Sequence, residues 1–400
     1  MTAHPPAVLA ATGWPSGLPW WLLLPLGCAA PLVVLGAAAV PALRRTGLSR
    51  GERVLAGLCV AALALAVLRA LLSGRTWIWV IADLMVPPLL LALVPAALLA
   101  VTALLVILAA LTPRVRLSSA GRRWSLLPAA AALALGLGQA GVHPPGRAGA
   151  DGPAPRDALR VVSWDALCWD EGDDTARFYR YLREWRADVY LLQEHAGCAP
   201  GALVPLNDDD RLRREFPGYA IATADGLLTI SRLPITRTVP IGWTSNPAAG
   251  NWNRAALRTD LDVGGRVLSV YNVHLYDMLY LDSGPFSPRF HRTIRTLDAA
   301  RRAQLDQLVA DLRGNSAPLL VSGNFNMLPG TGFARLMDRW KDASAAGTSP
   351  YPATLAFGGL RLWRMDWTFT SPDLPVHRYD LRSPEGMSSH HLQDVLVSLP

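Results

Sequence analysis

Residues 319–330 read LLVSGNFNMLPG. An apolar run, a glycine and two asparagines around a phenylalanine indicate a buried strand that ends in a polar loop. Position 324 holds an amide where a catalytic loop would hold a carboxylate. The stretch is therefore either an ordinary exit from a strand or a catalytic loop without its acid, and the rest of the chain decides between the two.

The apolar residues of this 400-residue chain are unevenly distributed. Residues 20–142 are dominated by leucine, alanine and valine, whereas charged residues concentrate after residue 150. We therefore predict a membrane domain over residues 1–142, a linker rich in proline and glycine over residues 143–157, and a soluble domain over residues 158–400.

The positive charge of the chain belongs to its membrane part. Residues 1–157 contain 12 arginines and 4 acidic residues, whereas the remainder is close to neutral. A protein that binds duplex DNA needs a basic face. Duplex nucleic acid is therefore not a favoured partner of the soluble domain.

Four segments of the first part are candidates for crossing a bilayer, which takes ~20 apolar residues. They are residues 20–43, 54–72, 86–111 and 125–142. The last is short and rich in alanine and glycine, so the number of spans is three or four. Arg69 lies near the end of its segment, where we expect it to reach the headgroup region. The stretch TWIWVIADLM (76–85) suits the membrane interface.

The arginines predict the orientation of these spans. Residues 44–53 and 112–124 contain four arginines each, residues 73–85 contain one, and residues 1–19 contain none. The positive-inside rule places the two arginine-rich loops in the cytoplasm. Four spans then predict a multi-pass protein of a bacterial plasma membrane with an extracytoplasmic C-terminal domain. With three spans, that domain is cytoplasmic.

Two cysteines fall in the soluble part. Cys168 and Cys198 fit a disulfide in an oxidising compartment, and they fit two buried free thiols equally well.

From residue 158 onward, short apolar runs alternate with turn signals, which is typical of an α/β or α+β domain. The predicted strands are residues 159–164, 188–194, 226–231, 267–275 and 319–323, and the predicted helices are residues 175–186 and 293–313. Polar residues gather where the apolar runs end. They are Asp165, Glu194, Asn272, His274, Asn324, Asn326, Asp366 and the SSHH stretch at 388–391.

Taken together, these side chains would line one edge of a sheet sandwich. Carboxylates, imidazoles and amides in one place suit the hydrolysis of a phosphate ester. Taken singly, each fits a plainer role: a cap, a turn former, or, for His274, a hydrogen-bonded core histidine. Asp366, between Trp363 and Trp367, fits a surface position as well.

The ordered motifs of residues 158–400 resemble the endonuclease/exonuclease/phosphatase superfamily. They are LRVVSWDAL, DVYLLQEH, GLLTISRLPI, YNVHL, LLVSGNFN, MDWTF and SSHHLQDVLV. The resemblance implies an α/β four-layer sandwich, the DNase I-like phosphoesterase fold, behind N-terminal transmembrane helices. The anchored arrangement also resembles bacterial envelope members of the superfamily, a branch associated with glycopeptide resistance and lipid-linked phosphates.

The resemblance further implies a Mg²⁺ or Mn²⁺ site at Glu194, because these cations prefer carboxylate and water oxygens. Three positions depart from the family pattern: the opening asparagine is Asp165, the loop aspartate is Asn324, and the closing aspartate is Ser389. An asparagine can orient a water molecule but cannot accept its proton. Asp165 is a second candidate metal ligand, since it can supply charge from the opposite lip of the site.

The remaining roles also follow from the resemblance. Asp366 would orient His390, which would act as the general base or stabilise the phosphate in the transition state. His274 and Asn326 would donate hydrogen bonds to phosphate oxygens. Of the two adjacent histidines, 390 and 391, the motif favours His390.

These expectations describe a membrane-anchored, metal-dependent phosphoesterase-like protein. Its substrate would be a phosphodiester or a lipid-linked phosphate at the outer membrane face. The alternatives are a catalytically degenerate pseudoenzyme that binds a phosphorylated envelope ligand, and an extracytoplasmic nuclease. The expected partners are the lipid bilayer and the phosphorylated substrate; the sequence does not define an oligomeric state.

Overall fold

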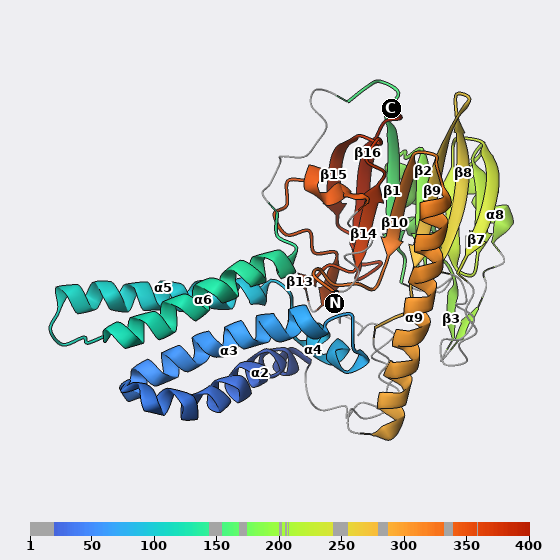
Figure 1. Cartoon of the computed structure of the whole chain (residues 1–400). Coiled ribbons are helices and arrows are strands. Elements are labelled where there is room, and N and C mark those ends of the chain that lie inside the picture. Colours follow the sequence, from blue (N-terminus) through green and yellow to red (C-terminus); the bar gives the residue numbers. More distant parts are fainter. Residues whose placement is uncertain are drawn as a thin grey trace. The chain divides into compact units, whose positions relative to one another are not determined.

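A computed structural model describes residues 20–143, 154–167, 174–199, 202–204, 206, 208–242, 255–278, 287–331, 339–357 and 359–400 (Figure 1). The chain divides into two compact units. Of the described residues, the helical unit comprises 20–142 and 328–331, and the sandwich unit comprises those within 143–327 and 339–400.

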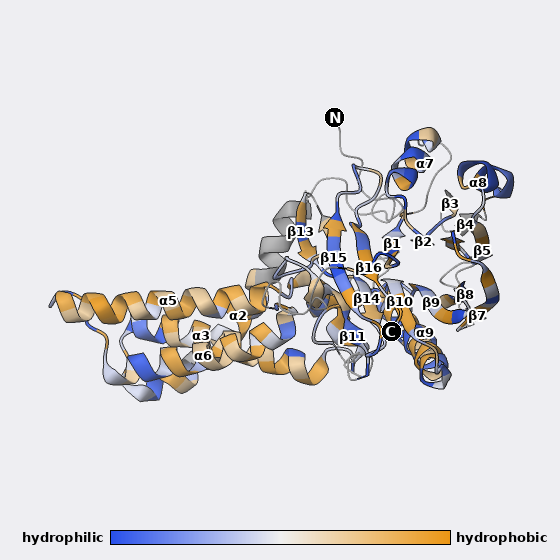
Figure 2. Cartoon of the chain, turned by 90° about the horizontal axis from the view of Figure 1, so that it is seen from above, coloured by the Kyte–Doolittle hydropathy of each residue, from blue (hydrophilic) through white to orange (hydrophobic). Residues whose placement is uncertain are grey.

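The helical unit contains four long helices. They are α2 (Trp20–Leu43), α3 (Arg50–Leu72), α5 (Leu90–Leu111) and α6 (Ser119–Ala140), and the short helix α4 (Val80–Met85) lies between α3 and α5. Single 3₁₀ turns occupy Arg44–Thr46 and Trp77–Trp79. Of these helices, α3 and α5 are long and apolar enough to cross a membrane, and Figure 2 shows the apolar character of this unit.

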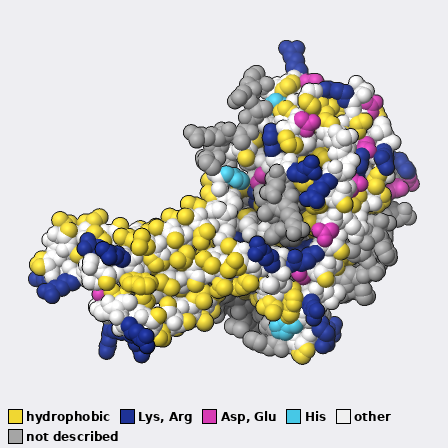
Figure 3. All heavy atoms as spheres, in the orientation of Figure 1, with side chains coloured by type: hydrophobic (Ala, Val, Ile, Leu, Met, Phe, Trp, Pro, Cys, Tyr) yellow, Lys and Arg dark blue, Asp and Glu magenta, His cyan; other side chains and the backbone are white. Residues whose placement is uncertain are grey.

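One acidic side chain fixes two turns at the same end of the helical unit. Ser49 caps α3, and Glu52 accepts hydrogen bonds from the backbone N–H of Ser49 at 2.9 Å and of Ser118 at 2.6 Å. The Ser118 hydroxyl caps α6, which is why this helix begins at Ser119 rather than at residue 125. The two arginine-rich turns therefore lie side by side, and Figure 3 shows basic side chains gathered at one end of this unit.

Arg69 does not reach toward a headgroup region as expected. Its side chain is 2% exposed and pairs with Asp83 of α4 at 2.9 Å. The same guanidinium donates to the backbone oxygens of Gln139 and Pro329. An ion pair and two carbonyl acceptors satisfy the charge inside the helical unit, so the arginine has no need of an aqueous surface.

The sandwich unit contains two six-stranded mixed sheets and two small hairpins. The first sheet has the order β15 (Val376–Arg382), β16 (Leu392–Val397), β1 (Leu159–Asp165), β2 (Val189–Gln193), β6 (Leu227–Ser231), β5 (Ala220–Ala224). The second has the order β11 (Lys341–Asp342), β14 (Asp366–Thr370), β10 (Leu319–Asn324), β9 (Arg266–His274), β8 (Ala256–Val263), β7 (Ile235–Ile241). The hairpins are β3 (Gly197–Ala199) with β4 (Ala202–Val204), and β12 (Leu355–Phe357) with β13 (Leu360–Trp363).

Apolar residues of both sheets form the core between them. This core includes Val161 and Leu191 of the first sheet and Val270 and Leu320 of the second, all essentially without exposed surface. Helices α7 (Thr175–Glu184) and α8 (Asp209–Glu215) pack on the outer face of the first sheet through an aromatic cluster around Trp164. Helix α9 (Pro288–Gly314) contacts the second sheet, where Asp311 accepts a hydrogen bond from Tyr271. A 3₁₀ turn covers Ala343–Ala346.

Each sheet contains one parallel pair of strands joined through a helix. The pair is β1 and β2 with α7 in the first sheet, and β9 and β10 with α9 in the second. Side chains at the carboxyl ends of a parallel pair lie at the same edge of its sheet. All five predicted strands and both predicted helices of the soluble part are confirmed, with shifts at their ends; α9 begins at Pro288, because Ser287 caps it. Cys168 and the side chain of Cys198 lie outside the described residues, so the two alternatives for them, a disulfide or two buried free thiols, are both untested.

Candidate active site

Four candidate residues lie at the carboxyl ends of the two parallel pairs. Asp165 ends β1 opposite Gln193, the residue before Glu194. His274 ends β9 directly opposite Asn324, the last residue of β10. The two strand–helix–strand segments therefore bring two carboxylates from one sheet next to an imidazole and an amide from the other.

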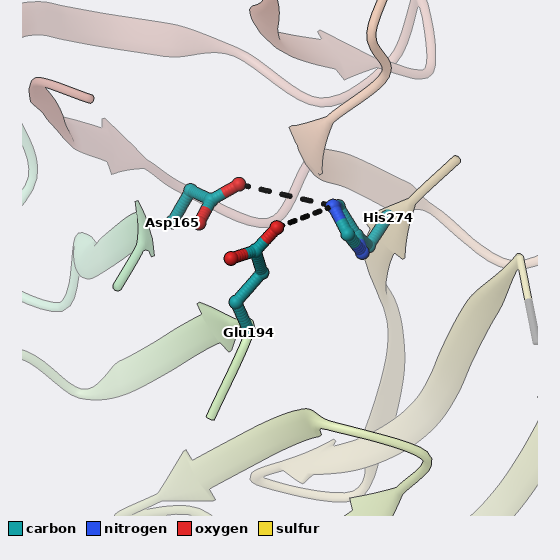
Figure 4. A group of neighbouring side chains, drawn as sticks. All are labelled: Asp165, Glu194 and His274. Carbon is teal, nitrogen blue, oxygen red and sulfur yellow. Dashed lines mark ion pairs between the residues drawn. The ribbon is translucent and has the colours of Figure 1, made fainter. Parts of the chain in front are cut away.

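Asp165, Glu194 and His274 form a compact group (Figure 4). His274 Nε2 lies 3.4 Å from Glu194 Oε1 and 3.9 Å from Asp165 Oδ2. The three side chains are between 0% and 14% exposed. Glu194 has a left-handed backbone, with φ of 52°, a conformation that costs energy for a side-chain-bearing residue and is concentrated at functional sites.

This group fits a divalent cation. Its ligand atoms lie within 4.8 Å of one another, and two ligands at right angles on a cation of the size of Mg²⁺ are about 3 Å apart. Two carboxylates provide the hard oxygens that Mg²⁺ and Mn²⁺ prefer, and the imidazole nitrogen is a further ligand that suits Mn²⁺ better than Mg²⁺. The residues that would hold the metal are therefore Asp165, Glu194 and His274.

A second group contains Asp165 again, with Asp366 and His390. His390 Nδ1 lies 2.8 Å from Asp366 Oδ2, and both side chains are buried. Burial alone would lower the pKa of His390, but the carboxylates of Asp366, Asp165 and Glu194 outweigh it and raise this pKa to about 10. His390 is therefore an imidazolium at neutral pH, which favours a role in stabilising charge or donating a proton over the role of general base.

Asn324 is bound to the carboxylate at the end of β1. Its Nδ2 donates to Asp165 Oδ2 at 2.7 Å, and its Oδ1 accepts the backbone N–H of Asn326 at 2.9 Å. The other oxygen of Asp165 accepts the backbone N–H of Leu167. A carboxylate thus remains at this point of the site, but it belongs to β1 and not to the loop after β10.

The orientation of the Asn326 side chain differs from what its predicted role needs. Its Nδ2 donates to the backbone oxygen of Leu275 at 2.9 Å and to Asp277 Oδ1 at 3.1 Å. These two bonds engage both hydrogens of the amide. A carbonyl can only accept a hydrogen bond, so Leu275 fixes which side of the amide carries the nitrogen. The amide hydrogens predicted to reach a phosphate are therefore already engaged.

Two further residues belong to this region, and neither was given a role from the sequence. Asp277 lies three positions after His274 in a sequence without a distinguishing motif, and its side chain meets Asn326. Ser388 donates to the backbone oxygen of Asp165 and accepts the backbone N–H of His390. The SSHH stretch at 388–391, which was noted among the polar residues at the ends of apolar runs, includes the second of these.

Other candidates lie outside both groups. Asn272 donates to the backbone oxygens of Leu192 and Leu228, so it connects the two sheets inside the core. His391 joins neither group, and its backbone N–H donates to Thr354. Three arginines at the start of α9 are exposed, which is typical of a solvated helix face. They are Arg289, Arg292 and Arg295.

Two mixed sheets with this edge of carboxylates and histidines define the class of DNase I-like phosphoesterase folds. Residues 162–390 match the model of the Endonuclease/Exonuclease/phosphatase family. The chain belongs to this family, whose members are phosphoester hydrolases and typically depend on a divalent metal.

Several solved structures are similar to the chain. A family protein of Beutenbergia cavernae DSM 12333 is 18% identical, with 61% of this chain and 72% of that chain covered and a TM-score of 0.44. One of Leptotrichia buccalis C-1013-b is 13% identical, with 60% and 100% covered and a TM-score of 0.45. The human Nocturnin catalytic domain with bound sulfate is 20% identical, with 61% and 94% covered and a TM-score of 0.42. No curated protein matches the chain.

Proposed function

We propose that the chain is a membrane-anchored, metal-dependent phosphoesterase whose site lies at the edge formed by β1, β2, β9 and β10. The observation that carries this proposal is the sharing of Asp165 by two donor groups. One group, with Glu194 and His274, suits a divalent cation, and the other, with Asp366 and His390, provides a buried cation. A catalytically degenerate site would not need both the metal-binding group and the buried imidazolium.

The bound metal would neutralise phosphate charge and lower the pKa of a water molecule. The protein's own residues supply the rest. Asp366 fixes the His390 ring through Nδ1, which leaves the Nε2 hydrogen for a ligand. In hydrolysis, the water oxygen bonds to phosphorus as the water releases a proton to solvent, the ester P–O bond breaks, and the leaving oxygen takes up this Nε2 proton, which solvent then restores to His390. Ser388 and the indole of Trp164 hold the His390 backbone in place.

The helical unit supports attachment to a bilayer. Large apolar side chains point outward along the helices, with Val67, Val101, Leu104 and Ile107 between 38% and 55% exposed. Soluble proteins rarely expose apolar surface on this scale. We propose that α2, α3, α5 and α6 all cross the membrane, that the two arginine-rich turns are cytoplasmic, and that the sandwich unit is extracytoplasmic.

A tethered, nearly neutral domain suits a substrate that is presented at a membrane, so we favour a lipid-linked phosphate or a phosphodiester over free duplex DNA. The test uses the full chain in detergent or nanodiscs, because residues 328–331, which follow β10 in the sequence, belong to the helical unit, where Arg69 donates to the backbone oxygen of Pro329. Hydrolysis of bis-p-nitrophenyl phosphate, a polyprenyl pyrophosphate and DNA is measured with Mg²⁺ and with Mn²⁺. Glu194→Ala is the matched variant.

Turnover by the wild type that is lost in Glu194→Ala supports the proposal. Preferential cleavage of DNA would favour the nuclease. Binding of the lipid-linked phosphate without turnover at any metal concentration would favour the pseudoenzyme. Substrate and metal are both part of the proposal, and each is varied separately in these experiments.

A further inference from the structure

Two asparagines, Asn324 at the end of β10 and Asn326 just after it, each donate an amide hydrogen to an aspartate of another segment. Asn324 donates to Asp165, and Asn326 donates to Asp277. The first aspartate belongs to the candidate metal group. The second has no part in either donor group, yet it lies close enough to the site for the charges of His274, Asp165 and His390 to act on it.

We propose that Asp277 is a positioning residue that holds the Asn326 amide with its oxygen available to the reaction. The proposal rests on the phosphoesterase function proposed above. The Leu275 carbonyl and Asp277 together engage both hydrogens of Asn326 Nδ2. The Oδ1 oxygen is then the atom of the amide that can serve a ligand, and it can only accept a hydrogen bond. Asn326 Oδ1 therefore accepts a hydrogen bond from the attacking water. The Asn326 amide does not donate a hydrogen bond to a phosphate oxygen.

The surroundings of Asn326 explain why a fixed amide is needed. Asn326 has a left-handed backbone, with φ of 47°, and the residue as a whole is 8% exposed. Its backbone oxygen accepts a hydrogen bond from the buried Arg301 of α9 at 2.9 Å. Backbone and side chain are thus both held, and Asp277 is one of the two acceptors that hold the side chain. Burial raises the pKa of Asp277, with a further contribution from Asp165, although the nearby His274 and His390 oppose this rise.

Two variants separate a positioning role from its competitors. Asp277→Asn keeps an oxygen that accepts from Asn326, whereas Asp277→Ala removes it. We expect Asp277→Ala to lower kcat by about 10- to 100-fold with little change in KM, because the water is misplaced. Asp277→Asn should stay within about threefold of the wild type. Asp188→Ala is the control, since Asp188 precedes the opposite end of β2 and pairs with Arg232; it should lower stability without lowering kcat of the folded protein.

Equal kcat in all three proteins would overturn the proposal, and so would an equal loss in Asp277→Asn and Asp277→Ala, which would make Asp277 the general base. A second measurement does not depend on turnover. The full chain has eight asparagines, so selective ¹⁵N-asparagine labelling resolves the Asn326 amide by NMR. Its side-chain hydrogens should be protected from exchange in the wild type and in Asp277→Asn, and one should lose protection in Asp277→Ala. Unchanged protection in Asp277→Ala overturns the proposal even if the wild type hydrolyses nothing, whereas loss of protection with an inactive wild type places the failure in the proposed function.

Discussion

Exchanging the amide and the carboxylate of the Asp165–Asn324 pair tests whether the charge of the site has simply moved from one strand to another. In the double variant Asp165→Asn, Asn324→Asp, every hydrogen bond of the pair has an equivalent. Asn at 165 accepts the Leu167 N–H with its oxygen and donates to the new aspartate, which in turn accepts the Asn326 N–H. We therefore expect the double variant to be within about 1 kcal/mol of the wild type in stability.

Each single change leaves two groups of the same kind in contact. Asp165→Asn sets two amide nitrogens against each other, and an unsatisfied buried donor costs about 1–3 kcal/mol. Asn324→Asp sets two carboxylates at the 2.7 Å of the present bond, where their repulsion at an effective dielectric constant of about 20 is about 6 kcal/mol before relaxation. One carboxyl will take up a proton instead of bearing this repulsion, so the net loss should again be about 2–4 kcal/mol.

The assay is a double-mutant cycle on the full chain in detergent, followed by tryptophan fluorescence during heating, together with Mn²⁺ titrations. Asp165→Asn should lower Tm by about 2–12 °C and Asn324→Asp by about 4–16 °C, since 1 kcal/mol corresponds to about 2–4 °C in a domain of this size. The double variant should recover most of this loss, and its Mn²⁺ affinity should exceed that of Asp165→Asn. Additive losses, with the double variant less stable than either single variant, would refute the reasoning.

Three further predictions concern other parts of the molecule. Glu194→Gln should weaken Mn²⁺ binding by at least about tenfold in a calorimetric titration, because it removes a charged ligand from a buried group; an unchanged affinity would place the metal elsewhere. Asp366→Asn should lower the pKa of His390, so the Tm difference from the wild type should be greatest below pH 6.5 and should shrink as the pH rises from 6.5 to about 10, where the folded-state charge is lost; a difference that grows over this range would contradict the pairing. In the helical unit, Arg69→Met should lower Tm more than Arg69→Met with Asp83→Leu, because the single change leaves a buried aspartate without its cation; equal losses would argue against a buried ion pair.

The sequence was informative where local pattern determines structure. The strands were predictable because runs such as LLVSG are apolar, short and bounded by turn residues. The residues at their ends were predictable as a set, since Asp165, Glu194 and His274 each follow such a run and the structure brings them together. The start of α9 was missed by five residues, because a Ser-Pro pair at 287–288 is a helix start that apolar spacing alone does not reveal.

The parts that escaped prediction depend on contacts between distant segments. Asp277 lies in a loop without periodicity, and its partner Asn326 is 49 positions away. The orientation of the Asn326 amide depends on a hydrogen bond to the backbone oxygen of Leu275, and a backbone acceptor cannot be predicted from a pattern of side chains. Arg69 was expected at a membrane surface because it lies near the end of its apolar segment, and no local pattern pairs it with Asp83, which stands in a stretch that suits the membrane interface. In each case the residue types were visible, but their pairing was a property of the fold.

The two strand–helix–strand segments each contribute to the metal group from a different sheet. Asp165 and Glu194 belong to the sheet of β1 and β2, and His274 belongs to the sheet of β9 and β10. An ion held by all three is consequently a cross-link between the halves of the sandwich, in the way that a disulfide joins two segments. At a concentration 100 times its Kd, such an ion adds about 2.7 kcal/mol to the free energy of unfolding. The concentration of divalent cations in the compartment would then determine the stability of the sandwich unit as well as its rate of hydrolysis.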